Sequence, residues 1–74
     1  MESKVLGRSL VVDQRDAANA REYIELFVNA GTATIVDVIY RDDNAEFVIG
    51  DCDEGTFLGI ISDLMVEGIE LWYS

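Results

Sequence analysis

The chain has 74 residues, of which 50% are apolar, and fifteen acidic side chains outnumber five basic ones to give a formal net charge of −10. This length and composition predict a single domain over residues 1–74 with one modest core. The charge argues against direct binding to nucleic acid or to anionic membranes, because both rely on Lys and Arg. It favours association with a basic protein surface. Solubility alone, or adaptation to high salt, would explain the same charge.

The sequence contains no histidine and a single cysteine, Cys52. An internal disulfide is therefore excluded, and the commonest general base and transition-metal ligand is missing. No apolar run approaches the roughly 20 residues of a membrane-spanning helix. The first residues also lack the pattern of a signal peptide. We therefore expect a cytoplasmic protein.

The first part of the chain predicts a strand, a helix and a hairpin. Lys4–Val12 favours a strand through its valines. Arg15–Ala30 follows acidic residues that can cap a helix, and Gly31 has the position of a left-handed helix terminator. Thr32–Tyr40 and Ala45–Ile49 are predicted as strands joined by a turn rich in Asp and Asn. The apolar stripe of the helix is expected to consist of Ala17, Ala20, Tyr23, Ile24, Leu26, Phe27 and Val28.

The last part of the chain predicts a second helix and a final strand. Asp51 and Glu54 have the spacing of a capping box at the start of a helix over Asp53–Glu67. Gly59 within this helix costs about 1 kcal/mol relative to Ala, which predicts either close packing of the helix backbone on the sheet or a glycine that is merely tolerated. Gly68 then ends the helix and Ile69–Tyr73 alternates as a strand. The apolar side of this helix is expected to carry Phe57, Ile60, Ile61, Leu64 and Met65.

The order strand, helix, strand, strand, helix, strand predicts an α+β fold of the ferredoxin-like βαββαβ type. This fold is a two-layer sandwich in which two helices cover one face of a four-stranded antiparallel sheet.

Period-two alternation assigns the strand residues to two faces of this sheet. The helix-covered face is expected to carry Leu6, Leu10, Val36, Val38, Phe47, Ile49, Ile69 and Leu71. The open face is expected to carry Ile35, Asp37, Ile39, Glu46, Val48, Glu70 and Trp72. Such a face is more apolar than a free surface needs, which predicts a protein contact, either with a partner or in a homodimer. The contact residues would include Ile35, Asp37, Ile39 and Trp72; alternatively, the last strand curls and Trp72 caps the core.

Acidic side chains are densest between residues 42 and 54. Turns and helix caps explain several of them, and the alternating acids after Gly50 lack two features of a calcium loop, the third ligand and the central glycine. We therefore expect no metal and no cofactor. Cys52 precedes a helix but lies among acids, so a catalytic thiolate is not expected. The predicted partner-binding patch consists of Asp42, Asp43, Glu46, Asp51, Asp53 and Glu54.

These features favour a non-enzymatic binding or inhibitory protein that engages a basic protein surface. One version is a nucleic-acid mimic, whose carboxylates occupy the phosphate positions on a nucleic-acid-binding protein. In size, charge and sandwich fold the chain resembles small acidic phage proteins that block host defence nucleases, although no residue motif carries that resemblance. The alternatives are an ACT-like regulatory or ligand-sensing domain of the same topology, or an accessory subunit that dimerises through its sheet.

Overall fold

The computed structural model describes residues 8–73. The predicted order of elements is confirmed, although β1 is described only from Arg8, so Leu6 and the rest of the predicted first strand before Arg8 lie outside the described residues. The elements are β1 (Arg8–Asp13), the 3₁₀ turn η1 (Gln14–Asp16), α1 (Ala17–Asn29), β2 (Thr34–Tyr40), β3 (Asn44–Gly50), α2 (Glu54–Val66) and β4 (Leu71–Tyr73).

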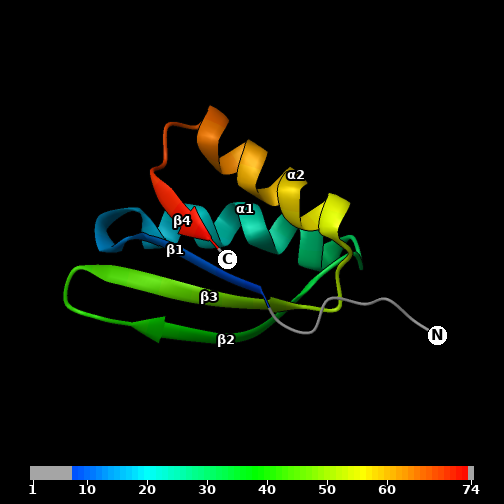
Figure 1. The fold of residues 1–74 in the computed structure, drawn as a ribbon, viewed down its shortest axis with the longest axis horizontal. Coiled ribbons are helices and arrows are strands. Elements are labelled where there is room, and N and C mark those ends of the chain that lie inside the picture. Colours follow the sequence, from blue (N-terminus) through cyan, green and yellow to red (C-terminus); the bar gives the residue numbers. More distant parts are fainter. Residues whose placement is uncertain (1–7, 74) are drawn as a thin grey trace.

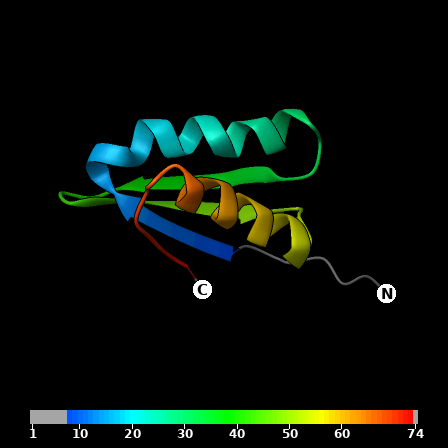
Figure 2. The ribbon, with the colours of Figure 1, turned by 90° about the horizontal axis from the view of Figure 1, so that it is seen from above.

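The four strands form one antiparallel sheet in the order β2-β3-β1-β4. Both helices cover the same face of this sheet and contact each other (Figures 1 and 2). The protein therefore has the predicted ferredoxin-like α+β fold, with β1 and β3 in the centre and β2 and β4 at the edges. Within residues 8–73, no helix is both long and apolar enough to cross a membrane.

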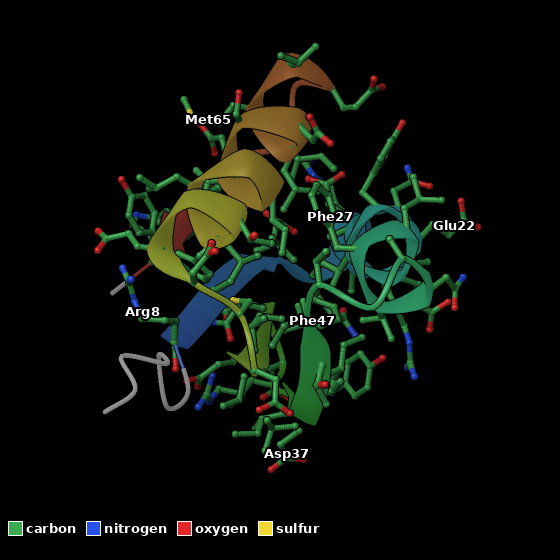
Figure 3. The ribbon with its side chains drawn as sticks, turned by 90° about the vertical axis from the view of Figure 1, so that its right-hand side faces the viewer. Arg8, Glu22, Phe27, Asp37, Phe47 and Met65 are labelled. Carbon is green, nitrogen blue, oxygen red and sulfur yellow. The ribbon has the colours of Figure 1, made fainter. Side chains whose placement is uncertain are left out.

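The core lies between the sheet and the two helices. Phe47 points from β3 into this layer, and Phe27 lies between α1 and α2 (Figure 3). Alternate residues of the two central strands are buried, as the period-two pattern predicts. The largest fully buried side chains are Leu10, Val12, Ile24, Phe47, Ile49, Phe57, Ile60 and Leu64.

The helix stripes are narrower than the sequence pattern predicts. Leu26 and Met65 were expected in the core, but each side chain is 62% exposed. Helical spacing places both residues at the margin of their stripes, and a two-layer fold of this size has no third layer outside the helices to cover them. The close packing predicted at Gly59 is also wrong, because an added Cβ would meet only Cε2 of Phe27, at 3.9 Å.

The helix ends follow the expected chemistry, with one correction. Gly31 and Gly68 take positive φ angles of 82° and 81° after α1 and α2. The Asp13 carboxylate accepts a hydrogen bond from the Arg15 amide, so the chain turns first through η1. The N-cap of α2 is Asp53, whose carboxylate accepts from the amide of Thr56 at 2.7 Å. The predicted capping role of Asp51 is wrong, because Asp53 holds the N-cap position and Asp51, two residues earlier, has a left-handed backbone with a φ of 53°.

A β-bulge in β2 changes the predicted faces of the sheet. Ile35 pairs with Ile49 but Asp37 pairs with Val48, so Val36 is an extra residue without a partner. One inserted residue reverses the alternation on one side of the bulge. Ile35, predicted on the open face, therefore packs against the core, and Val36, predicted in the core, is exposed.

Beyond the bulge, the face predictions for β2 are correct. Val38 packs against the core, whereas Asp37 and Ile39 lie on the open face with their partners in β3. The alternative that Trp72 caps the core is wrong, since its side chain is 61% exposed and it pairs with Val11 on the open face. Ile69 is buried, although it precedes β4.

Candidate functional site

Within residues 8–73, the face of the sheet opposite the two helices has no covering layer. Asp37 points away from both helices on this face (Figure 3). The side chains on it alternate with the buried residues of β1 and β3 and pair across the strands. We call this surface the open face; it consists of Ser9, Val11, Asp37, Ile39, Glu46, Val48 and Trp72.

One row of side chains crosses the open face from edge to edge. Ile39 of β2 pairs with Glu46 of β3, Glu46 pairs with Val11 of β1, and Val11 pairs with Trp72 of β4. Directly paired residues have Cβ atoms about 4.5–5.5 Å apart, so the four side chains are neighbours. The two ends of the row, Ile39 and Trp72, are exposed. The row therefore presents three apolar side chains around one carboxylate.

The carboxylate within this row is paired. Arg41 Nη2 donates to Glu46 Oε1 at 2.7 Å, and Arg41 Nη1 donates to Asn44 Oδ1 at 3.2 Å. Hydrogen bonds from Arg41 and from the Ser9 hydroxyl lower the pKa of Glu46 below its usual range. The side chain of Glu46 is also only 19% exposed. Its charge is therefore compensated within the chain, so it is a weaker candidate for a partner's cation than the sequence suggests.

Next to this row, the open face carries a second row and a shallow depression. The second row runs from Asp37 through Val48 to Ser9. The Asp37 carboxylate is exposed and accepts a hydrogen bond from the Val38 amide at 2.9 Å. The depression has a volume of about 240 Å³ and is lined by Ser9, Val11, Glu46, Trp72 and Tyr73.

The six residues of the predicted acidic patch do not form one patch. Asp42 and Asp43 lie in the hairpin turn, whereas Asp51, Asp53 and Glu54 lie at the start of α2. The seven residues of β3 separate the two groups by roughly 20 Å at about 3.3 Å per residue. Figure 1 shows these two sites at opposite ends of the sheet. Closeness in sequence was misleading here because the intervening segment is fully extended.

A further acidic group lies on the helix layer and was missed in the sequence. A hydrogen bond to Glu67, with the carboxylates of Glu22 and Asp63 nearby, raises the pKa of Tyr23 above its usual range. Asp63 lies on α2 and Glu67, four residues later, is the C-cap of that helix, a spacing that places them on one side of a helix. The spacing of Asp63 and Glu67 could have predicted that these two carboxylates are neighbours. The position of Glu22 beside them could not be predicted, because it depends on how α1 packs against α2.

In the described part of the chain, Cys52 does not have the surroundings of an activated thiol, and the acidic side chains form no metal-binding cluster. Cys52 is buried, and burial, reinforced by the Asp53 and Asp51 carboxylates, raises the pKa of its thiol. A raised thiol pKa disfavours the reactive thiolate. Over residues 8–73, no three His, Cys, Asp or Glu side chains gather in a way that could hold a metal ion.

No family model, curated protein or solved structure matches this chain. The strand order and pairing therefore define the fold on their own.

Proposed function

We propose that this protein is a non-enzymatic binding protein whose open face binds a basic surface of another protein. The observation that carries the proposal is the row Ile39–Glu46–Val11–Trp72, which crosses all four strands and is exposed at both ends. Protein interfaces combine an apolar centre with a polar rim, and Trp is enriched among the residues that dominate their affinity. The open face combines exposed apolar side chains, Trp72 among them, with the ion-paired Glu46 inside the row and the exposed carboxylate of Asp37 beside it.

The carboxylates around the open face support a basic partner. Asp37 lies on the face itself, and Asp42 and Asp43 lie in the turn that joins β2 and β3. Such exposed charges accelerate association with an oppositely charged surface and disfavour binding to other partners, while the apolar side chains of the face supply most of the affinity. Binding should therefore weaken as salt rises, but should not disappear.

A more specific version of the proposal is nucleic-acid mimicry. The hairpin turn and the start of α2 present carboxylates about 20 Å apart, and a protein that normally tracks a phosphate backbone has cations spread over a comparable length. In this version the chain inhibits its partner by competing with nucleic acid. A partner that binds the chain and nucleic acid simultaneously would contradict this version while leaving the broader proposal intact.

A homodimer through the same face, as in an ACT-like or accessory subunit, is the competing proposal. The apolar row would suit a second copy, but two chains with a net charge of −10 each repel one another. Light scattering at micromolar concentration distinguishes the two cases. A monomer of 8.2 kDa favours binding to a basic partner, and a dimer favours an ACT-like regulatory domain or an accessory subunit.

Affinity capture with matched variants tests the proposal. Ile39→Lys places a cation on the open face, whereas Val66→Lys makes the same change on α2, where the native side chain is 79% exposed. We expect the unmodified chain and Val66→Lys to retain a basic protein that Ile39→Lys loses. Equal retention by all three chains would contradict the assignment of the open face, and an acidic or neutral partner would contradict the assignment of charge.

A further inference from the structure

The two edges of the sheet differ in how they are protected. On the β2 edge, the bulge at Val36 interrupts the strand, and the Asp37 carboxylate takes up the amide of Val38 at 2.9 Å. Bulges and charged side chains are devices by which native sheets prevent another strand from pairing with an edge. The β2 edge is therefore poorly suited to accept a strand.

The β4 edge has no bulge and no charged side chain within its three residues. Leu71–Tyr73 pairs with β1 in regular register, and within residues 8–73 no strand lies on its other side. The sequence contains no proline that would block pairing there. Within the described part of the chain, this edge is protected by the shortness of β4, three residues, and by the charge of Glu70 just before it. Its outward backbone groups are thus available to a further strand.

An apolar groove lies along this edge, between β4 and the end of α2. Its volume is about 490 Å³ and its lining consists of Met65, Gly68, Ile69, Glu70, Leu71 and Tyr73. Met65 projects from α2 on the side away from α1 (Figure 3). The ring of Tyr73 packs edge-on against the buried Phe57, with centroids 5.9 Å apart, which holds one wall of the groove in place. A free strand edge next to an apolar pocket is the arrangement that binds extended peptides by strand addition.

Charge indicates which segment would fit. Among the described residues that line the groove, Glu70 carries the one charged side chain. A second carboxylate, that of Glu67, lies nearby at the C-cap of α2. Arg8 of β1 lies over the ring of Phe57 at 4.4 Å. The net charge of −10 disfavours a second copy of the chain at this edge. A segment that alternates apolar and basic residues would complement both the groove and Glu70.

We propose that the β4 edge binds an extended, basic segment of a partner protein as a fifth strand of the sheet. Backbone hydrogen bonds to β4 would supply affinity, an apolar side chain would lie between Met65 and Tyr73, and a basic side chain would face Glu70. This inference takes from the proposed function only the sign of the partner's charge. It concerns a different surface, so the two proposals can fail separately.

NMR of the full chain with a short synthetic peptide of alternating lysine and valine tests the inference. Strand addition predicts amide shift changes confined to residues 65–73 and slower hydrogen exchange in β4. A matching peptide of alternating glutamate and valine should bind much more weakly. Shift changes confined to Ile39, Asp37 and Val48 would place peptide binding on the open face and overturn the inference, as would the absence of any change at millimolar peptide or equal binding of the glutamate peptide.

Matched variants separate this site from the open face. Met65→Lys places a like charge against the lysine peptide and should weaken its binding by roughly tenfold or more, whereas the neighbouring exposed change Val66→Lys should have no effect. Ile39→Lys, on the far edge of the sheet, should also leave peptide binding unchanged. Equal binding by Met65→Lys and Val66→Lys would overturn the groove assignment, and a dimer that forms through β4 without peptide would show that a second copy occupies this edge instead.

Discussion

Gly50 lies directly against Val36, the extra residue of the β2 bulge. A Cβ atom added to Gly50 would lie 2.8 Å from Cγ2 of Val36, a distance that Cβ atoms essentially never show. Gly50→Ala should therefore lower the free energy of unfolding by about 1–3 kcal/mol, the usual cost of forcing extra volume into a packed site. Urea denaturation measures this change.

Two control variants show whether this contact is the cause. Val36→Ala removes Cγ2, so adding it to Gly50→Ala should restore most of the lost stability. Gly59→Ala, where the nearest atom to the new Cβ lies at 3.9 Å, should stabilise the protein by up to about 1 kcal/mol because alanine favours a helix. A double variant that is no more stable than Gly50→Ala alone would contradict the bulge geometry.

The N-cap of α2 gives a second prediction. The backbone hydrogen bond from the Thr56 amide lowers the pKa of Asp53 below its usual 3.8. Asp53→Ala removes this cap and should lower the melting temperature at neutral pH, whereas Asp53→Asn, which keeps a capping side chain, should lower it much less. The difference between wild type and Asp53→Ala should be present above pH 3.8 and shrink as the pH falls through the lowered pKa. Equal melting temperatures for the two variants at neutral pH would point to charge and not to capping.

Cys52 should be unreactive in the folded protein. Its side chain is buried, and burial raises the pKa of the thiol, so both access and ionisation oppose attack on a disulfide reagent. We expect slow labelling by an aromatic disulfide reagent at neutral pH and rapid labelling once the chain is unfolded in denaturant. Fast stoichiometric labelling of the native protein would contradict the placement of Cys52.

The ion pair on the open face predicts a pH effect. Hydrogen bonds from Arg41 and Ser9 lower the pKa of Glu46 below its ordinary 4.5 in the folded chain. The pair therefore adds stability above about pH 4.5 that is lost as the pH falls through the folded pKa. NMR titration of the Glu46 carboxyl carbon should show this pKa rising towards 4.5 in Arg41→Met. An unchanged pKa in that variant would show that Arg41 does not engage Glu46 in solution.

The element order was predictable because glycines, acidic caps and apolar periodicity agree along the whole chain. Gly31 and Gly68 end the helices as expected, and alternation in β1 and β3 identifies the buried residues correctly. The bulge at Val36 was not predictable, since nothing in a period-two pattern reveals an inserted residue; its one signal was Gly50, a strand glycine of the kind that marks close approach.

The candidate site was predicted only in part. Asp37, Ile39 and Trp72 lie on the open face as expected, whereas Ile35 does not. The prediction of one acidic patch was wrong because a high density of acidic residues in the sequence does not reveal that an extended strand separates them in space. The β4 groove depends on Met65, whose exposure follows from helix packing and not from its spacing.

The emission of Trp72, the single tryptophan, shows directly whether a partner binds to the open face. Its exposed indole lies at one end of the row that crosses the open face, so it reports whether a partner covers that face. We predict that acrylamide quenches Trp72 readily in the free chain, and that saturation with the captured basic partner shifts the emission to shorter wavelength and suppresses quenching. A partner that binds stoichiometrically while Trp72 remains as accessible as in the free chain would contradict the assignment of the open face as the binding surface.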